Sequence, residues 1–180
     1  MSQQVLLNQA VATIQGRMTD AGLVVGEIII NTALNWSYHR YVSKHSVSLP
    51  YDALFRVWPR TDKTGLLSEV TIIVPDPSVN DAVFSGTVVW SSETIVTLRV
   101  SPNCRHINPF LLTLLHDGSV QVKYGWAMRF ICDFSYDDVK FHIKEAISLK
   151  HLLCSEDMAP DSTSALLTEL DSDSKELIRV

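Results

Sequence analysis

The chain has 180 residues, of which 46% are hydrophobic, and its formal net charge at pH 7 is −5. This length and composition predict about one folded domain and exclude the disordered and fibrous classes. The three cysteines have no C-x-x-C spacing, which argues against a secreted disulfide framework and a standard zinc module, so we expect reduced thiols. Residues 156–180 hold seven acids and two bases. The neutral remainder argues against a strongly basic nucleic-acid-binding domain.

The first 20 residues are expected to form an N-terminal arm or a short helix. Val5, Leu6, Val11 and Ile14 lie among glutamines and other uncharged residues, and this spacing fits either structure. The segment lacks the basic start and the unbroken apolar stretch of a signal peptide. An apolar arm with no evident place in the core can dock on a neighbouring copy, so these four residues are candidates for self-association.

The next two elements are predicted from opposite periodicities. Apolar and polar residues alternate from Glu27 to Tyr41, and a period of two predicts one long strand. Pro50 and Asp52 then precede apolar residues at helical spacing, and Pro59 follows them. This pattern predicts a short helix over 51–58.

Strands dominate the middle of the chain. Runs rich in valine, threonine and isoleucine predict a strand over 69–74, a hairpin of 82–90 with 94–100, and a strand over 110–115. Asp117-Gly118 is a hairpin turn signal, and a second long strand over 120–134 follows it. Residues 136–153 fit either a strand and then a helix or a helix throughout, and we favour a helix from about Glu145.

Together these elements predict an α+β fold, with a twisted, mostly antiparallel sheet of about five or six strands and helices on one face. The core domain is expected to span 21–155. The acidic residues 156–180 have too little apolar surface to order themselves and are predicted to form a flexible tail.

No catalytic or cofactor-binding motif is present. The glycines form neither a dinucleotide fingerprint nor a phosphate-binding loop, and no serine lies in a nucleophile elbow. Cys104, His106 and His116 offer too few close ligands for a tetrahedral zinc. The many aromatic residues would suit base stacking, but alternation places the basic residues on the opposite faces of their strands, so core packing is the favoured interpretation. We therefore expect no enzyme, metal, cofactor or small-molecule substrate.

One local concentration of positive charge is a candidate membrane or nucleocapsid contact. Bases at the end of the predicted short helix stand beside apolar residues of the following loop, a combination that favours peripheral membrane binding. The residues concerned are Arg56, Arg60, Lys63, Gly65, Leu66 and Leu67.

Read in order, the chain resembles a rhabdovirus matrix protein of the short cytorhabdovirus type. The resemblance rests on the strand 27–41, the segment Tyr51-Asp52-Ala53-Leu54-Phe55-Arg56-Val57-Trp58, and a last strand running into Tyr136-Asp137-Asp138. It covers roughly residues 27–140 and lies in the order of elements.

The resemblance implies a structural protein of the virion, which self-associates, condenses the viral ribonucleoprotein and links it to the inner face of a host membrane in the cytoplasm. The alternative is another β-rich viral structural or movement-type protein, such as a jelly-roll subunit. A small enzyme is the third interpretation.

Overall fold

The computed structural model of the protein describes residues 9–101 and 108–149. It is 61% strand and 8% helix, with one helix among the described residues, so the predicted α+β class is wrong and the fold is nearly all β. Val5, Leu6 and the predicted tail lie outside the described residues.

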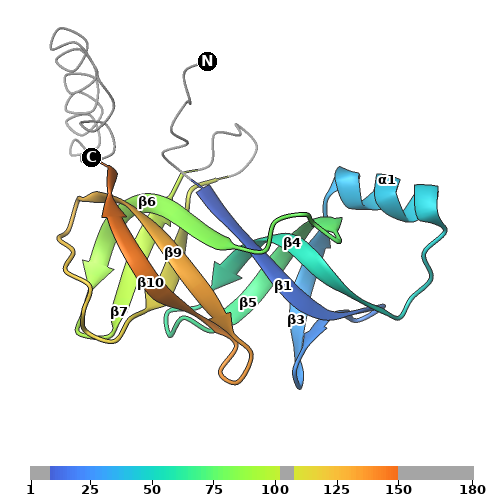
Figure 1. Cartoon of the computed structure of the whole chain (residues 1–180), viewed down its shortest axis with the longest axis horizontal. Helices are drawn as coiled ribbons and strands as arrows, with labels where there is room; N and C mark the ends of the chain where they lie inside the picture. The colour runs from blue at the N-terminus through green and yellow to red at the C-terminus, as the bar shows by residue number, and fades with distance from the viewer. Residues whose placement is uncertain (1–8, 102–107, 150–180) are drawn as a thin grey trace, which may run out of the picture. The chain divides into compact units, whose positions relative to one another are not determined.

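Ten strands and one helix follow one another along the described chain (Figure 1). They are β1 (Gln9–Thr19), β2 (Gly22–Val25), β3 (Ile28–Leu34), α1 (Trp36–His45), β4 (Tyr51–Thr61), β5 (Leu67–Pro75), β6 (Ala82–Ser91), β7 (Ile95–Val100), β8 (Phe110–Leu115), β9 (Ala127–Ser135) and β10 (Lys140–Ser148).

The first five strands close into a ring, which we call barrel 1. Its order is β1-β2-β3-β5-β4, and β4 pairs with β1 again. All its pairings are antiparallel except β3 with β5, which is parallel. Alternate side chains point inward, and Ile14, Leu23, Ile30, Phe55 and Ile72 are fully buried among them.

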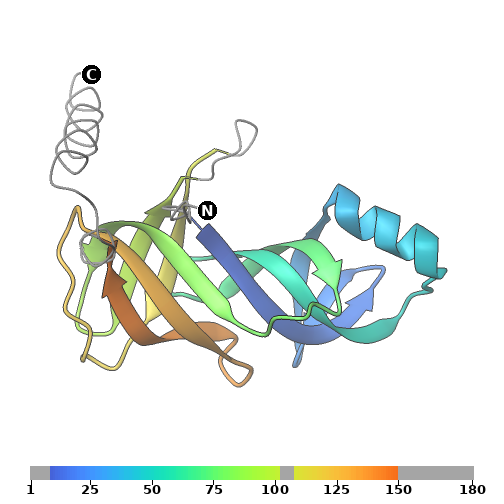
Figure 2. The same cartoon turned by 45° about the horizontal axis from the view of Figure 1, so that its top comes forward.

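The last five strands repeat this connectivity and form barrel 2. Its order is β6-β7-β8-β10-β9, and β9 pairs with β6 again. The third and fifth strands of this ring, β8 and β10, are again parallel, but they share a single residue pair, so this ring is looser at that point. Figure 2 shows both sets of strands from a second direction.

Both rings have the connectivity of the OB-fold, a five-stranded Greek-key barrel, and α1 of barrel 1 lies between the third and fourth strands. The registers match position by position. Gly16 pairs with Ala53 in barrel 1, and Gly86 pairs with Met128 at the same point of barrel 2. Two residues further along, the buried Phe55 and Phe130 occupy equivalent positions. The chain therefore contains a structural repeat that the sequence does not reveal by its letters.

The two barrels are joined where their first strands meet. β1 pairs antiparallel with β6. In this pairing Ala12 of barrel 1 lies opposite Ala82, the residue that occupies the equivalent position in barrel 2. A local two-fold relation between the barrels therefore passes through this pair. The loops between the fourth and fifth strands also meet, because Leu67 N donates to Val139 O at 3.0 Å.

Part of the predicted long strand is a helix, and the predicted short helix is a strand. Residues 36–45 form α1, where the long strand was expected to continue, because Asn35 caps the helix by accepting a hydrogen bond from Ser37 N at 2.9 Å. Residues 51–61 form β4 in place of the predicted short helix. Pro59 is tolerated there because the pairing of β4 with β1 ends at Val57.

The predictions for the end of the domain were also partly wrong. Asp117-Gly118 does not join β8 to β9 in a hairpin, since β9 pairs with β6 and β10, and the strand begins at Ala127. Residues 145–148 belong to β10, so the favoured helix from Glu145 is wrong. A bulge between Ile143 and Glu145 shifts the alternation and gives the apolar residues an apparent helical spacing.

The other strands are confirmed. β5 covers the strand predicted over 69–74, β6 and β7 form the predicted antiparallel hairpin, and β8 spans 110–115. The predicted N-terminal arm or short helix is wrong for residues 9–19, because Gln9–Thr19 is β1 and Ile14 lies in the core of barrel 1. Two closed rings also differ from the two packed sheets of a jelly roll.

Candidate ligand-binding faces of the two barrels

The outer faces of the first three strands of each barrel are equivalent surfaces. OB-fold barrels bind oligonucleotides and oligosaccharides on the outer face of the second and third strands and on the adjoining loops. The strand registers place two matching rows of side chains there: Arg17, Val24 and Ile29 on barrel 1, and Thr87, Arg99 and Leu111 on barrel 2.

The row on barrel 2 is open. Leu111 is 56% exposed, and Arg99 and Thr87 are exposed beside it. Arg99 makes no ion pair within residues 9–101 and 108–149. Asp52, the acid that binds Arg17 in barrel 1, has Ala127 as its equivalent in barrel 2, so that acid is absent from this face.

Exposed aromatic side chains border this face. Trp90, the last residue but one of β6, pairs with Thr97 and is 52% exposed. The loop before β9 is held against β6 by two hydrogen bonds, from Gly125 N to Val88 O at 2.8 Å and from Val88 N to Trp126 O at 2.9 Å. This loop presents Tyr124 and Trp126 to solvent, next to the β6 segment that ends in Trp90.

A cation accompanies the loop aromatics, since the Lys123 ammonium lies 5.5 Å from the centre of the Trp126 ring. The prediction that the aromatic residues form the core is therefore wrong for Trp90, Tyr124 and Trp126, and also for Trp36 on α1. It is confirmed for Tyr38 and Phe130, which are buried.

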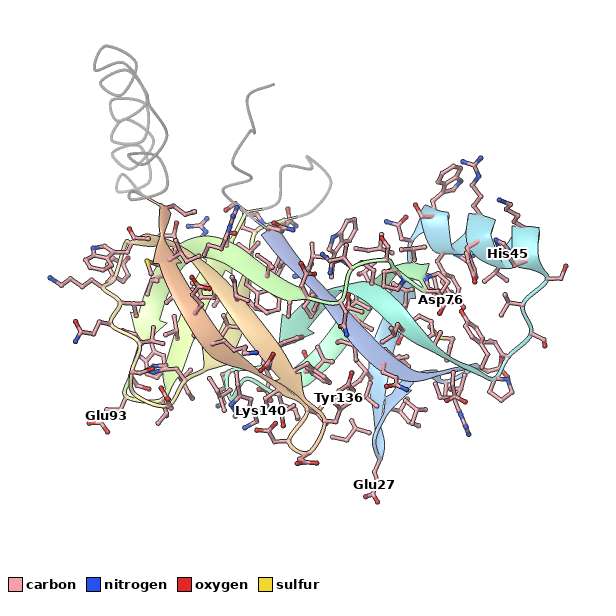
Figure 3. All side chains as sticks on the ribbon, in the orientation of Figure 1. Glu27, His45, Asp76, Glu93, Tyr136 and Lys140 are labelled. Atoms are coloured by element: carbon pink, nitrogen blue, oxygen red, sulfur yellow. The ribbon has the colours of Figure 1, made fainter. Side chains whose placement is uncertain are left out.

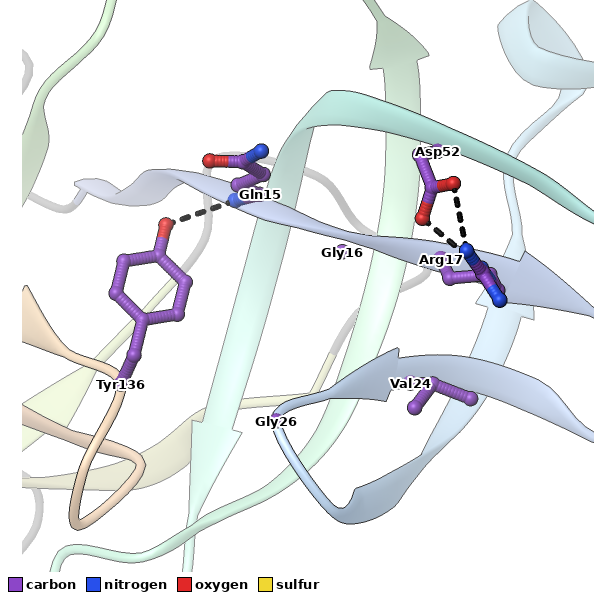
Figure 4. Close-up of a pocket in the computed structure, with 7 residues that line it drawn as sticks. All are labelled: Gln15, Gly16, Arg17, Val24, Gly26, Asp52 and Tyr136. Carbon is purple, nitrogen blue, oxygen red and sulfur yellow. Dashed lines mark hydrogen bonds and ion pairs between the residues drawn. The ribbon is translucent and has the colours of Figure 1, made fainter.

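Arg17 and Val24 of the row on barrel 1 belong to one wall of a cavity of about 400 Å³ (Figure 4). The opposite wall is Tyr136, which comes from the loop between β9 and β10 of barrel 2. Figure 3 shows Tyr136 on that loop, beside the β2–β3 hairpin whose turn carries Glu27. The lining consists of Gln15, Gly16, Arg17, Val24, Gly26, Asp52 and Tyr136.

Two pairs of contacts fix the polar groups of this cavity (Figure 4). Arg17 donates from Nε and Nη2 to the two carboxylate oxygens of Asp52, both at 3.0 Å. This hydrogen-bonded pair lowers the pKa of Asp52. The Tyr136 hydroxyl accepts a hydrogen bond from Gln15 N at 2.9 Å, and its ring packs edge-on against Phe134. Barrel 2 therefore positions an aromatic ring over the face of barrel 1.

The predicted basic surface does not form one exposed patch. Arg56 lies on β4 with its guanidinium on Asp81 and on the Thr13 hydroxyl, at the junction of the barrels. Arg60 lies over the Phe110 ring, with its guanidinium carbon 4.1 Å from the ring centre. Only Lys63 among the three bases is exposed.

The apolar residues of the same loop point inward. Leu67 is buried in β5, Leu66 packs against the core, and Gly65 is buried against Leu115 of barrel 2. The expectation of exposed apolar residues beside the bases is therefore wrong. Of the self-association candidates in the described chain, Ile14 is fully buried and Val11 is half-buried in β1.

Neither Arg99 nor Tyr136 is part of a local pattern that indicates a ligand contact. Arg99 stands at an outward position of an alternating strand, which is the usual place of a solvated charge. Tyr136 drew notice only as part of the resemblance. The pairing of barrel 1 with a loop more than 100 residues away brings Tyr136 to Gln15, and no local pattern encodes that contact.

The imidazole of His116 is occupied by the chain itself. Its Nε2 lies 3.2 Å from Ser92 O, and its Nδ1 accepts from Gly118 N at 3.1 Å. Within the described ranges no three His, Cys, Asp or Glu side chains gather as metal ligands, and Cys104 and His106 lie outside them. Burial raises the pKa of the Cys132 thiol, which keeps this cysteine protonated.

No helix in residues 9–101 or 108–149 has the length and apolarity needed to cross a bilayer. Comparison with known proteins found no match among protein-family models, curated proteins or solved structures.

Proposed function

We propose that this protein is a non-enzymatic structural protein that binds single-stranded nucleic acid on the outer face of barrel 2. The observation that supports this most is the exposed Arg99, which makes no ion pair with any of the described residues, between the solvent-facing Leu111 and the aromatic edge that carries Trp90. The assignment of this face as a ligand site rests on analogy with other barrels of the same connectivity.

Exposed aromatic rings suit unpaired bases because every base has a flat face on which it stacks. Each stacked base contributes about 1–3 kcal/mol with little dependence on sequence. Trp90, Tyr124 and Trp126 offer such rings, while Arg99 and Lys123 supply the contacts to phosphate. Two phosphate contacts predict a shallow salt dependence, with a slope of log K against log salt of about −1.4.

The wider role that we propose is that of a viral matrix protein. Its support is the resemblance of the chain to that family, and contact with a ribonucleoprotein would use the nucleic-acid surface described above. Self-association and a link to a host membrane belong to the same proposal. The loop 63–67 does not support the membrane link, because Leu66 and Leu67 pack against the core and are not exposed beside the bases.

The test is fluorescence anisotropy with labelled oligo-dT and oligo-U. We expect the wild-type protein to bind both single strands more tightly than a duplex of equal length. Replacement of Trp90 by alanine is expected to weaken binding about 5- to 150-fold, which corresponds to about 1–3 kcal/mol. Arg99→Ala should weaken binding and flatten the salt dependence by about 0.7 in slope.

The matched control is Thr71→Ala, on the outer surface of β5 and away from the barrel 2 face. This variant should bind like the wild type. Equal binding by wild type, Trp90→Ala and Arg99→Ala would remove barrel 2 as the site, and no binding to any single strand would reject the nucleic-acid function.

A further inference from the structure

Both barrels contribute residues to the cavity on barrel 1. One wall is the outer face of β1 and β2, and the opposite wall is Tyr136 from barrel 2. The outer face of β1 and β2 is equivalent to the open face of barrel 2. A volume of about 400 Å³ lies in the range of small-ligand sites. The two barrels therefore present equivalent faces in different states, one open and one roofed by an aromatic ring.

The polar groups of this cavity favour a neutral, planar ligand. Arg17 and Asp52 compensate each other, so the site offers no net charge to an anion. Their planar pair still has unused hydrogen-bonding capacity, because Nη1 makes no hydrogen bond to Asp52 and each carboxylate oxygen keeps a second lone pair. Tyr136 uses its oxygen as an acceptor for Gln15 N, which leaves its own O–H proton free to donate.

Two glycines contribute only backbone to the lining of the cavity. At Gly16 an added Cβ would lie 2.8 Å from both Leu23 Cδ1 and Val24 O, on the side of the buried Leu23, so β1 and β2 approach closely there. At Gly26 a Cβ would lie 3.7 Å from Tyr136 O, at the mouth between the two walls. The space between the β1–β2 surface and Tyr136 therefore has room for a flat ring.

We propose that this cavity holds a single nucleobase of the bound strand, stacked on Tyr136 and hydrogen-bonded along its edge by Arg17 and Asp52. This inference rests on the proposed function, because the base belongs to the same single-stranded ligand. Stacking on an aromatic ring and hydrogen bonding to a base edge are the two contacts by which proteins hold unpaired bases. The bound strand would then contact both barrels, with phosphate and stacking contacts on barrel 2 and one base in the cavity on barrel 1.

The test combines affinity with the position of a crosslink. Oligo-U that carries 5-iodouridine is irradiated with the full-length protein, and the crosslinked residue is identified by mass spectrometry. We expect a crosslink at Tyr136. By anisotropy, Tyr136→Ala should weaken binding about 5- to 150-fold, while Tyr136→Phe, which keeps the ring, should stay within about threefold of the wild type.

A second variant separates loss of the ring from rearrangement of its loop. Val24→Phe fills the cavity from β2 without changing any residue of the β9–β10 loop, and it should weaken binding as Tyr136→Ala does. Thermal melting of each variant checks that the fold is retained. Tyr136 is partly exposed, so its truncation should change the melting temperature little.

The outcomes for the two proposals differ. If Tyr136→Ala and Val24→Phe bind like the wild type while Arg99→Ala is weakened, the base site is rejected and the nucleic-acid function stands. If an oligosaccharide competes for the cavity and oligo-U does not, the base assignment is overturned. If no single strand binds, both proposals fail.

Discussion

A single carboxylate oxygen organises the loop between β4 and β5. Oδ1 of Asp62 accepts hydrogen bonds from Thr64 N at 2.7 Å, from the Thr64 hydroxyl at 2.7 Å and from Leu66 N at 3.1 Å. Partial desolvation raises the pKa of Asp62, but these hydrogen bonds outweigh it, so its pKa lies below the ordinary value. The ionised form is thus favoured in the folded protein.

Replacement of Asp62 by alanine should lower the free energy of unfolding by about 1–2 kcal/mol, because three donors lose one charged acceptor. Asp62→Asn keeps an acceptor and should lose less. The depressed pKa stabilises the fold above the ordinary aspartate pKa, and this contribution disappears as the pH falls through the folded-state pKa. The difference between wild type and Asp62→Asn in urea unfolding should therefore shrink from pH 6 to pH 2.5. A difference that is constant with pH would contradict this account.

At the scale of the elements, the equivalent glycines of β1 and β6 allow the first strand of each barrel to approach the second. A Cβ at Gly86 would lie 2.5 Å from the backbone oxygen of Arg99, and the contact at Gly16 is 2.8 Å. Real side chains do not tolerate such distances, so a larger residue must move one strand.

Gly86→Ala should therefore destabilise the protein by about 1–3 kcal/mol, the usual cost of overpacking. Gly16→Ala is expected to cost less, because one of its two nearest atoms belongs to the Leu23 side chain. Urea denaturation measures both, with Thr87→Ala, the exposed neighbour of Gly86, as the control. A Gly86→Ala variant as stable as Thr87→Ala would show that β6 and β7 separate freely.

Strands with uninterrupted alternation were predictable, and the failures have local causes. Residues 36–39 keep the alternating pattern of β3, and the hydrogen bond that starts the helix is accepted by one side chain, Asn35. In β4, proline at both ends gave the appearance of a short helix, while the buried Phe55 and Val57 follow a period of two. The bulge in β10 hid a strand behind helical spacing.

At the scale of the molecule, the sequence did not show that the ten strands form two related rings. The two rings are related by which of their strands pair. In each ring a parallel pair, β3 with β5 or β8 with β10, joins strands that are separated along the chain by another element. The candidate faces depend on the same long-range pairing. For that reason, periodicity could not predict that Arg99 is exposed beside Leu111 or that Tyr136 lies over barrel 1.

The position of β1 changes what an N-terminal truncation tests. Deleting residues 1–8 leaves every described strand intact and should keep the melting temperature within a few degrees of the full-length value. Deleting residues 1–16 removes most of β1, which pairs with β2, β4 and β6, and should abolish cooperative unfolding. Circular dichroism during heating distinguishes the two. A cooperative transition in the longer deletion would mean that β1 is dispensable.

The pairing of β1 with β6 at Ala12 and Ala82 has a consequence for the order in which the chain folds. All five strands of barrel 1 lie within residues 9–75, so this ring can close on the ribosome before β6 has been synthesised. Until then the first residues of β1, from Gln9 to Ala12, present a free edge that only β6 later covers. At this stage the free edge of β1 can pair with a strand of a neighbouring nascent chain. The strand that would take the place of β6 is β1 of the second copy, because β1 and β6 are equivalent strands of the two barrels.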